Sequence, residues 1–223
     1  MPNNEKLSFD IPPMPTSGVD PLMRAIDAIA SQGFAVLDDF LTPTETESLA
    51  NIVKEKWLKG QMVSAKTGKA GLKNQHIRGD CIAWLDEHDK QPAVQAYFRQ
   101  MEMLRLQLNT QLFMNVHELE THITAYPVGR VYQKHLDQFS QGTTLEIQYR
   151  QLSAVLYLNA NWQALYGGAL RLYLDENNCL DILPNAGRIV LFLSAKFWHE
   201  VLPAKRERLS LTGWFRTRNH LVI

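Results

Sequence analysis

The chain has 223 residues, and its 23 lysines and arginines balance its 23 aspartates and glutamates, so the formal net charge is zero. This balance argues against a protein that binds nucleic acid through bulk positive charge, because such proteins are usually basic. A chain of this length buries roughly 70% of its unfolded surface, so it can fold without a disulfide or a structural metal. The composition is that of a globular protein, and at this length one domain is the default while two small domains are possible.

Cysteine usage and the amino-terminal segment indicate a cytoplasmic protein. Cys81 and Cys179 do not have a metal-binding spacing, and two reduced thiols are typical of an intracellular protein. The segment MPNNEKLSFD lacks the basic and then apolar regions of a signal peptide. The longest apolar runs are much too short to span a bilayer. We therefore expect a soluble protein that does not enter a membrane.

The first half of the chain predicts helices around short strands. Residues 1–19 are rich in proline and are expected to form an extended arm. Asp20-Pro21 provides an N-cap and a first helical residue, and Thr42-Pro43-Thr44-Glu45 is a capping box. Apolar residues recur at helical spacing in the third helical segment. The expected helices cover residues 21–32, 43–57 and 92–113, and the expected strands cover residues 34–37, 62–66 and 77–86.

The second half predicts strands separated by turn signals, over residues 119–126, 130–136, 144–149, 152–158, 168–174, 179–182, 187–193, 198–201 and 208–217. Many short strands without intervening helices are typical of a sandwich or a jelly roll. We therefore predict an α+β, mainly β, fold in one domain over residues 20–223. Supporting helices over residues 20–114 would pack on a β core of about residues 119–218.

A histidine and an aspartate two residues apart, His135 and Asp137, form the first candidate site. On a strand their side chains point to the same face, with Cα atoms roughly 6.6 Å apart, so both can reach one metal ion. A surface histidine–aspartate pair is the commoner explanation of such a tripeptide. His199 follows a later apolar strand, and two histidines with one carboxylate form the facial triad of non-haem Fe(II) oxygenases.

An arginine near the carboxyl end forms the second candidate site. Alternation along residues 208–214 puts Arg208 on the same strand face as Ser210, Thr212 and Trp214. If this face is buried, Arg208 needs an anionic partner, because an unpaired buried charge costs several kcal/mol. A dicarboxylate would supply that partner, since a guanidinium binds a carboxylate through two parallel hydrogen bonds. The alternative is a strand whose polar face meets solvent.

Longer stretches add to these motifs, namely GFAVLDDFL (33–41), IRGDCIAW (77–84), AYPVGRVYQKHLD (125–137) and HEV (199–201). With Arg208 and Trp214, they resemble the 2-oxoglutarate- and Fe(II)-dependent dioxygenases. More narrowly, they resemble the prolyl 4-hydroxylases of the hypoxia-inducible-factor type and their bacterial relatives. The matches run from about residue 30 to 218. The resemblance implies a double-stranded β-helix, a form of jelly roll, with supporting helices.

The resemblance also implies a role for each matching residue. The iron ligands would be His135, Asp137 and His199, which form the catalytic centre. Arg208 and Tyr157 would hold the distal carboxylate of 2-oxoglutarate, and Tyr126 would lie near the metal and the co-substrate. Pocket-wall positions match Leu170, Thr212 and Trp214, and residues that position substrate-covering elements match Arg78, Asp80 and Arg150.

The substrate side of the resemblance is less complete. We expect Asp80 to pair with Arg150, although they could be unrelated surface charges. The lysine-rich loop 67–75 lies where the family has a flexible finger that closes over a bound peptide. The loop between Tyr126 and Tyr132 is a residue shorter than the hypoxia-type pattern, and Gln138-Phe139 replaces the usual Asn-Pro. These departures leave the sequence of the substrate open.

The activity implied is hydroxylation of C4 of a prolyl residue in an exposed loop of a protein, and a translation elongation factor is a candidate target. Fe(II) would be the cofactor, 2-oxoglutarate and O2 the co-substrates, succinate and CO2 the products, and ascorbate a candidate stimulant. We expect a monomer without nucleic-acid or membrane partners. The alternatives are an oxygenase of a free amino acid or another small molecule, a non-catalytic sensor of 2-oxoglutarate or metal, and a nucleic-acid demethylase, which the charge balance disfavours.

Overall fold

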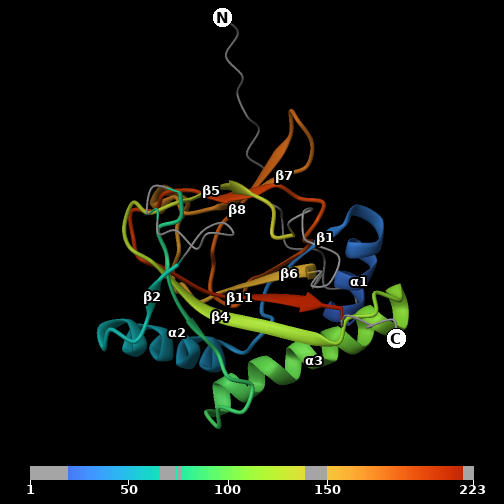
Figure 1. The fold of residues 1–223 in the computed structure, drawn as a ribbon, viewed down its shortest axis with the longest axis horizontal. Coiled ribbons are helices and arrows are strands. Elements are labelled where there is room, and N and C mark those ends of the chain that lie inside the picture. The colour runs from blue at the N-terminus through green and yellow to red at the C-terminus, as the bar shows by residue number, and fades with distance from the viewer. Residues whose placement is uncertain (1–19, 66–73, 75–76, 139–149, 218–223) are drawn as a thin grey trace, which may run out of the picture.

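The structure is a computed structural model that describes residues 20–65, 74, 77–138 and 150–217. The described residues form three α-helices, one short 3-10 helix and eleven strands (Figure 1). The predicted arm 1–19, the predicted strand 144–149 and all of the loop 67–75 except Asn74 lie outside the described residues.

The three helices begin where the sequence predicts. They are α1 (Pro21–Gln32), α2 (Pro43–Leu58) and α3 (Pro92–Leu112). The Asp20 carboxylate accepts a hydrogen bond from the backbone N–H of Leu22 at 3.0 Å. Thr42 and Glu45 form the reciprocal hydrogen bonds of a capping box at the start of α2. None of these described helices has both the length and the apolarity needed to cross a membrane.

The strands form two antiparallel sheets. The large sheet has the order β1 (Phe34–Leu37), β9 (Ile189–Leu193), β6 (Arg150–Tyr157), β11 (Arg208–Arg216), β4 (Glu118–Tyr126), β3 (Cys81–Trp84) and β2 (Val63–Ser64). The small sheet has the order β5 (Tyr132–His135), β10 (His199–Val201), β7 (Leu170–Tyr173) and β8 (Cys179–Ile182). The short 3-10 helix, η1 (Ala164–Tyr166), lies between β6 and β7 in the sequence.

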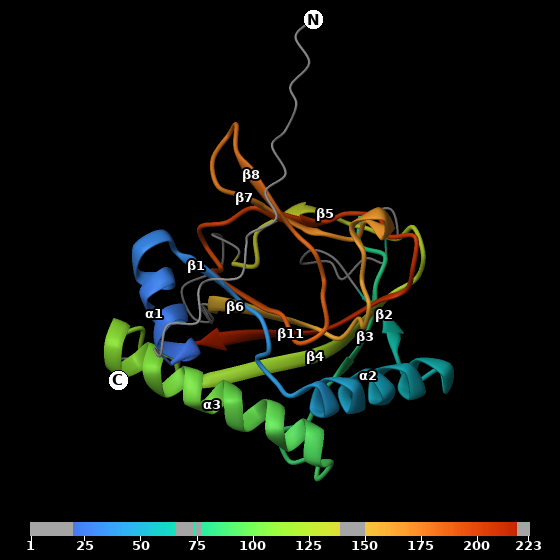
Figure 2. The same cartoon turned by 180° about the vertical axis from the view of Figure 1, so that it is seen from behind.

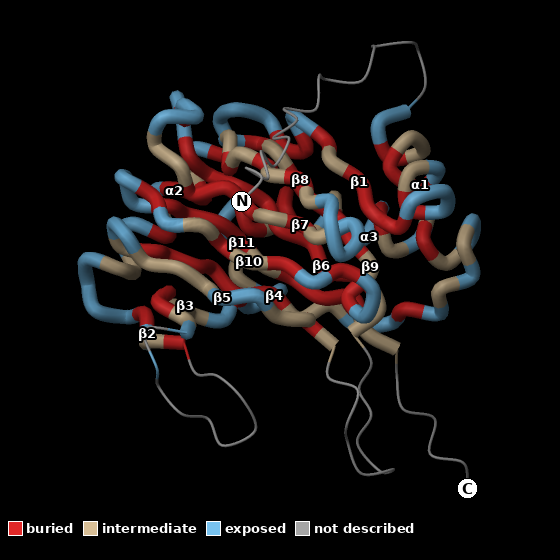
Figure 3. The backbone as a smooth tube through the Cα atoms, turned by 90° about the horizontal axis from the view of Figure 1, so that it is seen from above, coloured by how far each residue is buried: buried red, intermediate tan, exposed pale blue. Residues whose placement is uncertain are grey.

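The small sheet lies across one face of the large sheet, and the helices cover the other face (Figures 1 and 2). This is the predicted jelly-roll arrangement with supporting helices. Figure 3 shows the buried residues concentrated in the strands, while exposed residues lie mainly on the outer helices and the connections.

Strand β11 shows how the sequence divides these two faces. Leu209, Leu211 and Phe215 point to the helix side, where they belong to the same apolar core as Leu104 and Leu108 of α3. The alternate residues of β11 point toward the small sheet, and they line the cavity between the sheets: Arg208, Ser210, Thr212 and Trp214. The predicted alternation is therefore confirmed, and it gives the chain an apolar core on one face of the strand and a polar pocket on the other.

The predicted strand over residues 77–86 is shorter than expected because this segment passes from one sheet to the other. Arg78 makes a single bridge to Tyr132 at the edge of the small sheet. Cys81–Trp84 then pair with β4 of the large sheet. Within the described part of the predicted strand 62–66, the two residues of β2 pair with β3.

Replacing Thr42 with alanine is expected to lower the free energy of unfolding by about 1 kcal/mol, because the first turn of α2 loses its capping hydrogen bond. Urea denaturation would measure the change. Thr44→Ala is the matched control, since Thr44 lies in the same turn and is not the capping residue. Equal losses in the two variants would contradict the capping role.

Candidate active site

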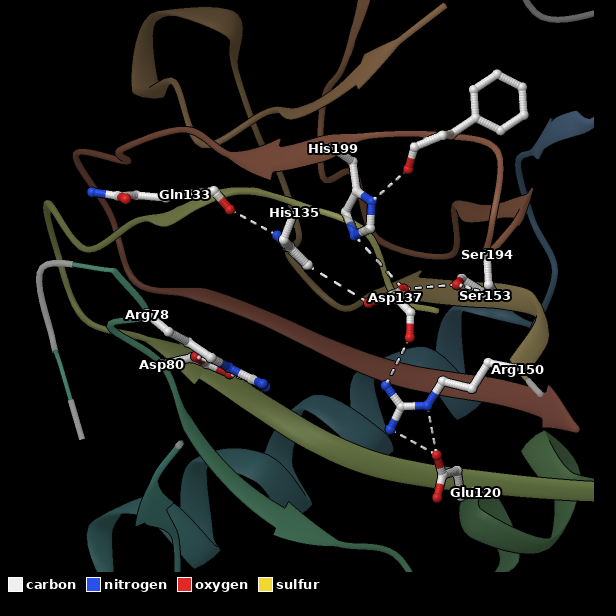
Figure 4. A network of polar contacts seen from close by, with 11 residues as sticks. Arg78, Asp80, Glu120, Gln133, His135, Asp137, Arg150, Ser153, Ser194 and His199 are labelled. Carbon is white, nitrogen blue, oxygen red and sulfur yellow. Dashed lines mark hydrogen bonds and ion pairs between the residues drawn. The ribbon is translucent and has the colours of Figure 1, made fainter. Parts of the chain in front are cut away.

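The predicted metal ligands meet between the two sheets. His135 ends β5, Asp137 follows it by two residues, and His199 begins β10, where its Cα atom lies opposite that of His135. The three side chains offer ligand atoms that all lie within 4.8 Å of one another (Figure 4). Each histidine Nε2 atom lies 3.6 Å from an oxygen of Asp137. The three residues therefore converge on one point, although β5 ends at His135 and Asp137 lies just beyond it.

Both histidines are held in the orientation that a metal requires. His135 Nδ1 lies 2.7 Å from the backbone carbonyl of Gln133, and His199 Nδ1 lies 3.1 Å from that of Phe197. A carbonyl can only accept a hydrogen bond, so each Nδ1 carries a proton, and in the neutral ring Nε2 then has the lone pair that a metal needs. The ring of Tyr132 also stacks on His135, with centroids 3.5 Å apart.

Asp137 is a buried carboxylate with a hydroxyl partner. Ser153 Oγ donates to Asp137 Oδ2 at 2.7 Å, and Ser153 lies 2.8 Å from the hydroxyl of Ser194. Burial alone would raise the pKa of Asp137, but His199, His135 and the Ser153 hydrogen bond outweigh it and hold the pKa well below its usual range. Burial lowers the pKa of His199 to about 4. Asp137 and His199 are therefore deprotonated at neutral pH, as metal binding requires.

Two neutral imidazoles and one carboxylate are the ligand set of the non-haem Fe(II) oxygenases. Such a triad leaves coordination positions for an oxidisable co-substrate and for oxygen. The described residues thus fit Fe(II).

Arg208 lies at one end of the same cavity and is almost fully buried, with 1% of its surface exposed. Its Nε donates to the carbonyl of Gly168 at 2.9 Å. Its Nη1 and Nη2 atoms, and the hydroxyl of Tyr157, have no hydrogen-bond partner among the described residues. The guanidinium lies 4.9 Å from the ring centre of Tyr157 and 5.2 Å from that of Tyr126. A buried charge with two free donors calls for an anion, and the distal carboxylate of 2-oxoglutarate fits this requirement.

The cavity brings together most of the residues predicted for co-substrate and substrate. Burial raises the pKa of Tyr126 and of Tyr157, so both phenols keep their protons and can donate hydrogen bonds. The predicted residues that line the cavity beside the metal ligands and Arg208 are Tyr126, Leu170, Thr212, Trp214, Arg78 and Asp80. Arg150 lies against Trp214, with its Cζ atom 3.6 Å from the ring centre.

The predicted pair between Asp80 and Arg150 is wrong. Arg78 donates to both oxygens of Asp80, at 2.8 and 3.1 Å, whereas Arg150 pairs with Glu120 (Figure 4). The strand register explains the difference. Arg150 lies opposite Arg216 on β11, and Arg216 lies opposite Glu118 on β4, so the acidic residues of β4 are the neighbours of Arg150.

Sequence reasoning missed two residues, Ser153 and His122. Ser153 is a small polar residue inside an apolar strand, and only its place opposite Trp214 on the neighbouring strand could have indicated a site residue. His122 shares one face of β4 with Thr124, whose hydroxyl lies 2.8 Å from its Nδ1, and it lines the cavity. Burial lowers the pKa of His122 to about 4, so it is neutral.

Replacing Ser153 with alanine is expected to weaken Mn(II) binding about tenfold, because a hydrogen bond that orients the ligating carboxylate is lost. Mn(II) is a redox-stable substitute for Fe(II), and electron paramagnetic resonance would measure its Kd. Ser194→Ala should have a smaller effect, since Ser194 contacts Asp137 through Ser153. An unchanged Kd in Ser153→Ala would contradict the orienting role.

Comparisons with known proteins agree with this geometry. Residues 121–216 match the sequence model for the 2OG-Fe(II) oxygenase superfamily. A prolyl-4-hydroxylase from Pseudomonas putida is 39% identical with a TM-score of 0.79, and the match covers 89% of this chain and 100% of that chain. A prolyl hydroxylase from Trichoplax adhaerens, in complex with a peptide fragment of the hypoxia inducible factor oxygen degradation domain, is 25% identical with a TM-score of 0.78, covering 87% and 88%.

A viral collagen prolyl hydroxylase from Paramecium Bursaria Chlorella virus-1, in a 2OG complex, shares the fold at 17% identity and a TM-score of 0.62, covering 85% of this chain and 98% of that chain. The metal triad lies within the matched superfamily region. The chain belongs to the prolyl 4-hydroxylase family of 2-oxoglutarate-dependent dioxygenases, and it is an enzyme that uses Fe(II), 2-oxoglutarate and O2.

Proposed function

We propose that the protein hydroxylates C4 of a prolyl residue in a protein substrate. The observation that carries this proposal is the 39% identity to the Pseudomonas putida prolyl-4-hydroxylase over the whole of that chain. The Trichoplax adhaerens enzyme adds support, because its structure is a complex with a peptide fragment.

The proposed reaction divides one O2 molecule between two products. When bound, Fe(II) and 2-oxoglutarate supply the oxygen chemistry, in which one oxygen atom enters the prolyl C4–H bond and the other enters succinate as CO2 is lost. His135, Asp137 and His199 hold the metal. Arg208 and the Tyr157 hydroxyl bind the distal carboxylate of 2-oxoglutarate, which fixes the direction in which the co-substrate enters the cavity.

The length of β11 supports a second substrate at the other end of the cavity. Arg208 and Trp214 are six residues apart on this strand, which corresponds to about 20 Å. A small co-substrate held by Arg208 therefore cannot also fill the Trp214 end. The side chains there are suited to a polypeptide, because a charged group lies beside an aromatic ring, with Arg150 stacked on Trp214.

Within this proposal a translation elongation factor is the candidate protein, and the enzyme acts as a cytoplasmic monomer. The residues predicted to position the substrate, Arg78, Asp80 and Arg150, would contact or order the target loop. The alternatives from the sequence, a small-molecule oxygenase and a non-catalytic sensor, are distinguished by the experiments below.

Replacing Arg208 with alanine is expected to weaken 2-oxoglutarate binding by about 3 to 5 kcal/mol, because the carboxylate then lies unpaired in a buried site. Isothermal titration of the Mn(II)-loaded protein with 2-oxoglutarate would measure this change. Arg206→Ala is the matched control, since Arg206 is exposed and lies two residues away. An equal affinity in Arg208→Ala and the native protein would contradict the assignment.

The substrate itself can be captured with an inert metal in place of iron, which prevents turnover. Captured proteins, together with a purified elongation factor, would then be incubated with the Fe(II) enzyme, 2-oxoglutarate and O2. We expect one oxygen atom added to a proline, with succinate released in equal amount, as mass spectrometry would detect. An Asp137→Ala variant is the control.

Two results would contradict the proposal. Oxygen added only to a free amino acid or another small molecule would indicate the small-molecule oxygenase. Binding of 2-oxoglutarate without any succinate release from the Fe(II) protein would indicate the sensor.

A further inference from the structure

Glu120 lies between two arginines, and each of its carboxylate oxygens contacts one of them. Arg150 donates from Nε to Oε1 at 2.8 Å, its Nη2 forms an ion pair with the same oxygen at 2.7 Å, and Arg216 donates from Nη1 to Oε2 at 2.8 Å. Glu120 is mostly shielded, with 23% of its side chain exposed. Because both oxygens are engaged, the carboxylate cannot turn without losing a charged hydrogen bond.

Arg150 connects this carboxylate to the active site. Its Cζ atom lies 3.6 Å from the ring centre of Trp214, which lines the catalytic cavity. Its Nη1 also faces the main-chain carbonyl of the metal ligand Asp137 at 3.5 Å, a long hydrogen bond (Figure 4). One guanidinium thus contacts an aromatic wall of the cavity and the backbone of a metal ligand.

The contacts on Arg150 depend on the direction of its planar group. A guanidinium stacks on an indole and donates in its own plane, so both contacts require one orientation. A long arginine side chain has many rotamers, and holding it in one costs conformational entropy. Glu120 opposes this cost by binding the two nitrogen atoms on one side of the group, which leaves Nη1 facing Asp137.

We propose that Glu120 is a positioning residue that acts through Arg150 to hold Trp214 and the Asp137 backbone in place around the metal. The role concerns the metal centre, so it is independent of whether the oxidised substrate is a prolyl residue. Glu120→Gln keeps the size of the side chain but puts an N–H donor where one arginine now donates. The metal ligands themselves are unchanged.

The test is a double-mutant cycle of Glu120→Gln and Arg150→Met, with the Kd for Mn(II) measured by electron paramagnetic resonance. Each single change is expected to raise the Kd about tenfold, as is typical when a group behind a metal ligand is lost. The double variant should bind Mn(II) no more weakly than Arg150→Met alone, because Glu120 acts only through Arg150.

Asp181→Asn is the matched control for loss of an ion pair. Asp181 pairs with Arg171 through two hydrogen bonds of 2.7 Å and is similarly shielded, but it lies on β8. This variant is expected to leave the Kd for Mn(II) unchanged. The proposal is overturned if Glu120→Gln behaves like Asp181→Asn, or if the effects of Glu120→Gln and Arg150→Met add.

Arg150→Lys provides a second measurement if Glu120→Gln does not fold. Lysine keeps the charge but has neither the fork nor the planar group. The proposal requires this variant to lose as much Mn(II) affinity as Arg150→Met, and full retention of affinity would overturn it.

Discussion

The active site depends on the register between β10 and β5, which puts His199 opposite His135. Side chains alternate along a strand, so a slip of one residue would turn His199 away from the cavity. The pairing with β5 is irregular after His199, whereas the pairing of β10 with β7 is regular over its three residues. Tyr173 donates to Glu200 at 2.6 Å across that regular pair. The small sheet therefore holds the metal ligand in register from the side away from the metal.

The same alternation lets one strand serve two environments. The apolar residues of β11 pack on the helices and stabilise the strand. The opposite face of β11 lines the cavity and has few stabilising contacts. Arg208 is the clearest case, since its buried guanidinium has two nitrogen atoms without partners among the described residues. A protein that folds with such a group needs a strong apolar core elsewhere, because an unpaired buried charge opposes folding. Co-substrate binding would remove this penalty.

Features set by nearby residues could be predicted from the sequence. Only short spacings are involved in the helix caps at Asp20 and Thr42 and in the alternation of β11. The same holds for His135 and Asp137, which are two residues apart and converge on one point. His199 was added because of its residue type and its place after an apolar strand, and the family resemblance was needed to add Tyr157. The partner of Arg150 could not be predicted, because Glu120 is thirty residues away and becomes its neighbour only through the register of β4, β11 and β6.

The strand order of the large sheet has a consequence for biosynthesis. β1 lies early in the chain, but its partner is β9, with Phe34 opposite Phe192. During translation, β1 must wait until residues 189–193 leave the ribosome before it can pair. The apolar segment Phe34–Leu37 would meanwhile be an unpaired strand, which is the kind of segment that chaperones bind and that aggregates readily. Completion of this edge of the large sheet therefore comes only after residues 189–193 have been synthesised.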